Sequence, residues 1–234
     1  MKVKIVYSLE AASGVMVGST SEVLKIGIDK GAMRSWLVTL DPSSNRLSNV
    51  NLGPVIPGST VKGKVRDQCE RIVRSIGTNR RACESPLPSR MCPPGQPPCD
   101  ICEFFGGPAV SSRLFFSDAA CQIAKEARPF STKVQTGVSL SRRRRVAEHE
   151  RLFFQERAAE GLTYEGVIDA HLDPGLADRQ LALIVVGLER LVAIGGGKSR
   201  GGGWSRITVR EVRKETQIIT CEHIQTIREA IRQW

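Results

Sequence analysis

Four cysteines lie close together in the middle of the chain, with the spacing of a metal site. Two form a Cys-x-x-Cys motif and two precede it in a proline-rich segment, residues 83–105; the four are Cys83, Cys92, Cys99 and Cys102. So many prolines prevent the segment from forming its own core, and another element must order it. Four thiolates are the ligand set of structural zinc, so we expect Zn²⁺. Redox chemistry is the alternative, although the thioredoxin-like order of strand and then helix is not evident.

Asp29 is a second candidate for chemistry, because it lies in a short loop between Gly27 and Gly31. An aspartate in such a loop is commonly a turn former whose side chain bonds its own backbone. The same carboxylate could instead hold a divalent metal ion or move a proton. The local sequence leaves both interpretations open.

Residues 195–203 contain six glycines around Lys198-Ser199-Arg200. Glycine tolerates positive φ and close approach, so successive N–H groups of such a loop can surround an anion. The nucleotide-binding P-loop pattern fails, because it needs glycine at position 192, where the chain has Val192, and a helix after the loop. A loop that binds polymer phosphates remains, with a flexible hairpin turn as the alternative. Its expected phosphate-binding residues are Gly195, Gly196, Gly197, Lys198, Ser199, Arg200 and Gly201.

A helix is expected where apolar residues recur at helical spacing over residues 61–76, with Ser59 or Thr60 as its cap. Lysines and an arginine fall in its first turns, where they oppose the helix dipole. A bound anion would resolve this conflict, although a solvated basic face is the alternative. The phosphate-binding residues expected here are Ser59, Thr60, Lys62 and Arg66.

Four consecutive arginines follow a polar, hairpin-like segment and suggest a basic arm, with a disordered surface loop as the alternative. They are Arg142, Arg143, Arg144 and Arg145.

The composition favours a polyanionic partner. The net charge is +10, and arginine, whose planar fork suits phosphate, makes up most of the basic residues. Aromatic residues are only 5% of the chain, so backbone contacts rather than base stacking should supply the affinity. No apolar run reaches the length of a membrane span and the N-terminus does not resemble a signal peptide, so we expect a cytoplasmic protein without a membrane partner.

The elements that must position these residues follow the order strand, loop, helix, strands, helix and strand. This order predicts an α+β, ferredoxin-like sheet of the β-α-β-β-α-β type with insertions. A last amphipathic helix is expected over residues 220–234. The other expected elements are strands over 1–9, 111–123, 131–140, 162–172 and 204–212, and a helix over 175–194 that Asp173-Pro174 caps.

Three stretches together resemble the RAMP (repeat-associated mysterious protein) superfamily, specifically the backbone subunit of type III CRISPR effector complexes. Residues 56–66, IPGSTVKGKVR, resemble the family's PGSSLKGxxR helix start. Residues 99–106 and 112–119 resemble its CxICxLFG…SRLxFSDA segment, and the glycine loop resembles its C-terminal signature. The resemblance extends from the N-terminus to about Val212.

The resemblance implies a palm like an RNA-recognition motif over residues 1–212, with a zinc-binding segment at 83–105 and a thumb hairpin at 125–162. Such palms assemble along a CRISPR guide RNA, with other effector subunits and with further copies of themselves. The thumb wedges between the guide and the target RNA. Residues 213–234 lie outside the resemblance and form a C-terminal extension.

In active relatives an aspartate in the loop after the first strand cleaves the target RNA with Mg²⁺ or another divalent cation, and by position this residue is Asp29. The loop here reads Ile26-Gly27-Ile28-Asp29, one glycine fewer than the family's common IGGID. The expected mechanism has Asp29 assist deprotonation of a 2′-hydroxyl, while Lys30 or Arg34 neutralises the developing charge.

Two other functions stay open at this point. The chain could be a purely architectural guide-binding subunit without catalysis. It could also be a guide-processing endoribonuclease, which would commonly use a histidine; the chain has His149, His171 and His223.

Overall fold

The computed structural model describes residues 1–18, 27–41, 46–76, 82–215 and 217–219. The strands are β1 (Lys2–Ala11), β2 (Arg34–Asp41), β3 (Arg46–Ile56), β4 (Leu114–Phe116), β5 (Ala119–Cys121), β6 (Thr132–Leu140), β7 (Ala147–Ala158), β8 (Thr163–His171), β9 (Ser205–Lys214) and β10 (Gln217–Ile219). The α-helices are α1 (Gly58–Ile76), α2 (Asp100–Phe105) and α3 (Ala177–Glu189), and short 3₁₀-helices are η1 (Pro88–Arg90), η2 (Lys125–Phe130) and η3 (Lys198–Arg200).

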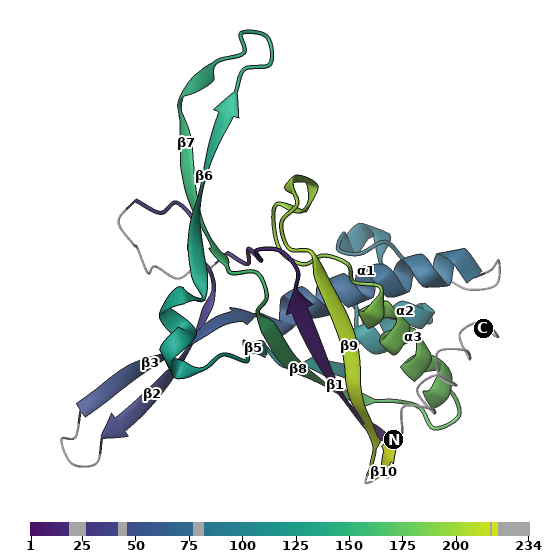
Figure 1. Cartoon of the computed structure of the whole chain (residues 1–234). Helices are drawn as coiled ribbons and strands as arrows, with labels where there is room; N and C mark the ends of the chain where they lie inside the picture. The colour runs from purple at the N-terminus through teal and green to yellow at the C-terminus, as the bar shows by residue number, and fades with distance from the viewer. Residues whose placement is uncertain (19–26, 42–45, 77–81, 216, 220–234) are drawn as a thin grey trace.

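Antiparallel strands form one large sheet, and the helices lie on one of its faces (Figure 1). Among the described residues eight strands join in this sheet, in the order β10-β9-β1-β8-β5-β3-β2, with β4 also paired to β8. The chain passes from β1 through α1 to β4 and β5, then through β8 and α3 to β9. The predicted α+β class is therefore confirmed, and the arrangement is consistent with the ferredoxin-like fold.

The core lies between this sheet and the helices. Alternate residues of β1 are buried, whereas Lys2, Lys4 and Glu10 are exposed on the opposite face. The helices α1 and α3 pack closely, since a Cβ on Gly187 would lie 2.6 Å from the Sγ of Cys69. No helix in the described part of the chain is both long and apolar enough to span a membrane. The fully buried β1 side chains are Val3, Ile5, Tyr7, Leu9 and Ala11.

The start of α1 differs from the expectation. The helix begins at Gly58, so Ser59 and Thr60 lie in its first turn and do not cap it. The N–H of Thr60 donates to the carbonyl of Pro57 (2.9 Å), and the N–H of Gly58 donates to Oδ1 of Asp118 (2.8 Å). The predicted cap was wrong because a carboxylate from a distant loop, rather than a local hydroxyl, accepts from the first unpaired donor.

The helix expected over residues 175–194 is shorter, because α3 covers Ala177–Glu189. Leu176 occupies the cap position without a side-chain hydrogen bond, and Asp173 forms an ion pair with Arg113 instead of capping the helix. The strand expected over 204–212 is confirmed as β9.

Two hairpins extend from the sheet (Figure 1). Strands β6 and β7 pair from Thr132 opposite Ala158 to Leu140 opposite Ala147, within the segment 125–162 that was predicted to hold a thumb. Strands β2 and β3 form a second hairpin that the sequence did not indicate. The helix expected over 220–234 lies outside the described residues.

Two glycines of α1 provide a matched test of its packing. A Cβ on Gly58 would lie 2.3 Å from the carbonyl oxygen of Phe116, whereas a Cβ on the exposed Gly63 would meet nothing within 4 Å. We expect Gly58→Ala to lower the free energy of unfolding by about 1–3 kcal/mol through overpacking. Gly63→Ala should raise it by about 0.5–1 kcal/mol, because alanine loses less backbone entropy in a helix. Urea unfolding of both variants measures the difference, and equal effects would contradict this account.

Candidate functional site

The four cysteines of residues 83–105 meet beside α1. Their Sγ atoms all lie within 4.8 Å of one another, and tetrahedral zinc with bonds of about 2.3 Å requires sulfur separations of about 3.8 Å. The short helix α2 brings its N-cap, Cys99, close to Cys102. Backbone N–H groups also point at the sulfurs, because the N–H of Cys99 donates to Sγ of Cys92 (3.2 Å). This donor set fits a metal ion such as zinc.

Arg66 is part of the surroundings of this cluster. Its guanidinium donates to Sγ of Cys102 (3.3 Å) and to the carbonyl of Gly106 (2.8 Å), and it pairs with Glu70 (2.9 Å). Burial raises the pKa of the Cys102 thiol. Burial acts the same way on Cys99, but backbone and thiol hydrogen bonds outweigh it and bring the pKa of Cys99 to about 7. The contacts of Arg66 all lie inside the protein, and they do not support its predicted role in phosphate binding.

Lys62 is engaged in a similar way. Its Nζ donates to Oγ of Ser112 (2.7 Å) and to the carbonyl of Leu114 (3.0 Å), and burial together with the charge of Arg66 lowers its pKa. Ser59 is exposed and Thr60 is half-buried. The basic start of α1 therefore serves the protein's own packing at Lys62 and Arg66.

The glycine loop is a compact turn whose amides face inward. The N–H groups of Gly196 and Gly203 donate to the carbonyls of Met16 (2.8 Å) and Gly14 (3.0 Å). Those of Arg200, Gly201 and Gly202 bond within the loop. The prediction that successive loop amides surround an anion is therefore wrong for these five groups. Positive φ angles occur at Gly195, Gly197, Gly201 and Gly203.

The loop and α1 come together through two lysines. Lys198 lies against Lys64 of α1, and this contact, followed by burial, lowers the pKa of Lys198. Ser199 and Arg200 are exposed next to it. Asp67 and Arg71 of α1 also lie near Lys198, so cations outnumber carboxylates at this surface and favour a bound anion. Two segments that the sequence marked separately for phosphate binding thus form one cationic surface.

Asp29 lies against the stem of the β6–β7 hairpin. Its N–H donates to the carbonyl of Phe154 (3.0 Å), and its Oδ2 accepts from the N–H of Phe154 (2.7 Å). Lys30 forms a parallel bridge with Gln155. Both Asp29 and Lys30 are exposed, so the carboxylate and the ammonium are open to a ligand from solvent.

A buried ion pair holds this loop in place. Arg34 pairs with Glu156 of β7, and their side chains are only 11% and 3% exposed. Oγ1 of Thr132 accepts from Arg34 (2.7 Å) and donates to Glu156 (2.8 Å), while the N–H of Ala32 donates to Oε2 of Glu156 (3.1 Å). This pairing turns Arg34 toward the hairpin stem, which leaves Lys30 as the exposed cation next to Asp29.

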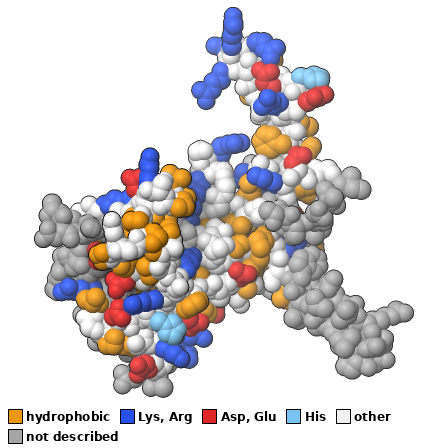
Figure 2. All heavy atoms as spheres, turned by 180° about the vertical axis from the view of Figure 1, so that it is seen from behind, with side chains coloured by type: hydrophobic (Ala, Val, Ile, Leu, Met, Phe, Trp, Pro, Cys, Tyr) orange, Lys and Arg blue, Asp and Glu red, His pale blue; other side chains and the backbone are white. Residues whose placement is uncertain are grey.

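The four arginines occupy the tip of the hairpin. Arg142–Arg145 are all exposed, and Arg144 pairs with Glu148. Figure 2 shows Lys and Arg side chains gathered at this end, with acidic side chains and a histidine among them. His149 is exposed at the tip and His171 lies on β8, while His223 is outside the described residues.

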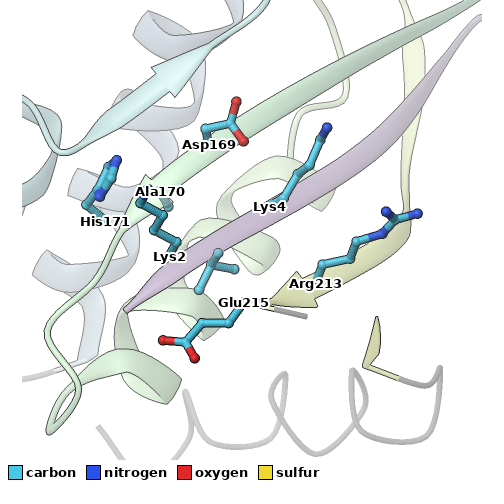
Figure 3. A pocket seen from close by; sticks show the side chains of 8 residues that line it. Lys2, Lys4, Asp169, Ala170, His171, Arg213 and Glu215 are labelled. Atoms are coloured by element: carbon cyan, nitrogen blue, oxygen red, sulfur yellow. The ribbon is translucent and has the colours of Figure 1, made fainter. Parts of the chain in front are cut away.

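The open face of the sheet has a hollow of about 400 Å³ (Figure 3). It is lined by Lys2 and Lys4 of β1, Asp169 of β8, Arg213 of β9, and Glu215, which follows β9. Two carboxylates offset most of the charge of the three cations, so the field of the hollow is only weakly positive and attracts a polyanion poorly.

The Arg34–Glu156 pair can be tested by a double-mutant cycle. We expect Arg34→Met or Glu156→Leu alone to cost about 3–5 kcal/mol of stability, because each removes the oppositely charged partner of a buried charge. The double variant should cost less than either single one. The exposed pair of Arg90 and Glu84 is the control, and breaking it should cost less than about 1 kcal/mol because water screens it. Strictly additive losses in urea unfolding would show that the buried pair is not coupled.

The cysteine cluster predicts a measurable metal content. The purified protein should hold about one zinc ion per chain, and Cys99→Ser should lose it, whereas Cys121→Ser, outside the cluster, should retain it. Affinity should fall as pH falls, because the thiols must be deprotonated to bind the ion. Elemental analysis measures the content, and zinc retained after loss of Cys99 would contradict the assignment.

A family model described as the RAMP superfamily matches residues 44–206, which include α1, the four cysteines, the β6–β7 hairpin and the glycine loop. No curated protein matches the chain. Because the model covers most of the sequence, the chain belongs to the RAMP superfamily.

Proposed function

We propose that this chain binds a CRISPR guide RNA as a backbone subunit of a type III effector complex and cleaves the paired target RNA at Asp29. Membership of the RAMP superfamily suggests a CRISPR-associated, RNA-binding role. The observation that carries the proposal is the contact between Asp29 and Phe154, which joins the candidate catalytic loop to the stem of a long basic-tipped hairpin.

Phosphates of the guide would lie on the cationic surface formed by Lys64, Lys198 and Arg200. Lys64 and Lys198 lie far apart in the sequence but meet in space, and Arg200 is exposed in the same loop. Contacts with phosphates read no base, so the guide sequence would be recognised by complementary pairing alone. The hairpin, with Arg142–Arg145 at its tip, would act as the thumb between guide and target. Further copies of the chain and other effector subunits would extend the same surface along the RNA.

In the proposed cleavage, Asp29 takes the proton of a target 2′-hydroxyl. The 2′-oxygen forms a bond to the adjacent phosphorus while the bond to the 5′-oxygen breaks, and that oxygen takes a proton from water. The product strand then ends in a 2′,3′-cyclic phosphate. Lys30, exposed next to Asp29, would offset the charge that develops on the phosphorus oxygens.

A divalent ion such as Mg²⁺, when bound, would supply further stabilisation of that charge. Asp29 is its candidate protein ligand. In the described part of the chain the cysteines form the one group of three or more metal-ligating side chains, so water and RNA oxygens would have to complete the coordination at Asp29.

A purely architectural role has one observation in its favour. Oδ2 of Asp29 already accepts a hydrogen bond from Phe154, so the residue has a structural task that needs no catalysis. The same bond makes the ordinary alanine variant ambiguous, because it removes the chemistry and the contact together.

Asp29→Asn separates the two roles. The amide oxygen can still accept from Phe154, but the variant lacks the carboxylate that would take a proton. We expect target cleavage by the assembled complex to fall about 100-fold or more, with guide and target binding unchanged. Timed cleavage assays with a labelled target RNA measure this loss. Cleavage at the wild-type rate would leave the architectural function.

A further inference from the structure

Arg157 follows Glu156 in β7, and its side chain passes beneath the glycine loop. It is only 8% exposed, although it carries a full positive charge. A Cβ on Gly202 would lie 2.6 Å from its Nη1, and a Cβ on Gly197 would lie 2.9 Å from its Nη2. These two glycines therefore leave the space that the guanidinium occupies. No local pattern indicates this contact, because Arg157 precedes the loop by about forty residues.

The charge of Arg157 is not compensated within the described part of the chain. Its Nε is buried and has no hydrogen-bond partner there, and no carboxylate there forms an ion pair with it. Glu156, which precedes Arg157 in the sequence, faces the other side of the strand and pairs with Arg34. Buried cations are normally paired or hydrogen-bonded, because an unpaired one costs several kcal/mol. A buried guanidinium without a compensating charge is suited to binding an anionic ligand.

The surroundings favour an anion with several oxygens. Lys198 belongs to the same loop, where it lies against Lys64 and near Asp67 and Arg71 of α1, so the loop borders a surface with more cations than carboxylates. The planar fork of arginine matches phosphate geometry better than a point charge does. A Cβ on Gly201 would meet nothing within 4 Å, so this part of the turn is open to a bulky group, whereas the space at Gly197 is filled by Arg157.

We propose that Arg157 binds a backbone phosphate of RNA at the glycine loop. This assignment rests on the proposed RNA-binding function. It differs from the sequence-based expectation, because a buried side chain of β7, rather than the loop's own amides, holds the phosphate.

The test uses full-length protein, a labelled single-stranded RNA of mixed sequence, and the variants Arg157→Met, Arg157→Lys and Arg179→Met. Arg179, exposed on α3, is the matched control for loss of one positive charge. We expect Arg157→Met to weaken binding about 10-fold or more and to lower the slope of log affinity against log salt by about one. Arg157→Lys should retain part of the affinity, and Arg179→Met should bind like wild type.

Thermal unfolding without RNA distinguishes a ligand-binding residue from a structural one. If Arg157 is held for a ligand, Arg157→Met should unfold at the same temperature as wild type or higher, because the variant removes an unpaired buried charge. Inorganic phosphate should raise the unfolding temperature of wild type more than that of Arg157→Met. A lower unfolding temperature with an unchanged salt slope would overturn the assignment in favour of a purely structural arginine.

The outcomes also separate this assignment from the function on which it rests. If Arg157→Met binds RNA as tightly as wild type does, the phosphate site is overturned and the proposed RNA binding stands. Stabilisation by phosphate with no effect of Arg157→Met on RNA binding would show an adventitious ion only, and would also overturn the site. Wild-type protein that binds no RNA at low salt would contradict the proposed function itself.

Discussion

The end of one strand, residues 154–158 of β7, connects the parts of the molecule that could do chemistry. Phe154 holds Asp29, and Glu156 holds Arg34 and the N–H of Ala32. Ala158 bonds in both directions with Val15, whose neighbour Met16 accepts from the glycine loop. Because a strand alternates its side chains, the same few residues can serve loops on both sides of the hairpin stem. Movement of the hairpin would therefore act on the Asp29 loop and the glycine loop together.

Two adjacent buried residues of this strand, Glu156 and Arg157, differ in whether their charges have partners. Glu156 has a complete set of partners in a guanidinium, a hydroxyl and a backbone N–H, so its burial stabilises one arrangement of loop and hairpin. Arg157, on the other face, lies under the glycine loop with a buried Nε that has no partner among the described residues. A protein that tolerates such a cation gives up stability at that position, and this is the usual sign that a group is reserved for a ligand.

The candidate metal site and the candidate RNA-binding surface both involve residues of α1. Arg66, on the inner side of the helix, donates to the cysteine cluster, whereas Lys64 reaches the glycine loop. A cation bound by the four sulfurs would order the proline-rich segment that packs on this helix. The segment would then support the helix from which one of the phosphate-binding groups extends.

The sequence by itself determined the α+β class, the helix expected over residues 61–76, strand β9 and the four clustered cysteines, because periodicity and ligand spacing are local signals. It did not indicate the β2–β3 hairpin, in which only Val55 and Ile56 of β3 pair with β5 while the rest extends beyond the other strands (Figure 1) and so needs no regular apolar alternation. Tertiary structure alone decided that Asp118 caps α1, that Lys62 and Arg66 turn inward, and that Arg157 lies beneath the glycines. Each of these contacts joins residues that are 36 to 60 positions apart in the sequence. No local pattern specifies which partner a buried charge will meet.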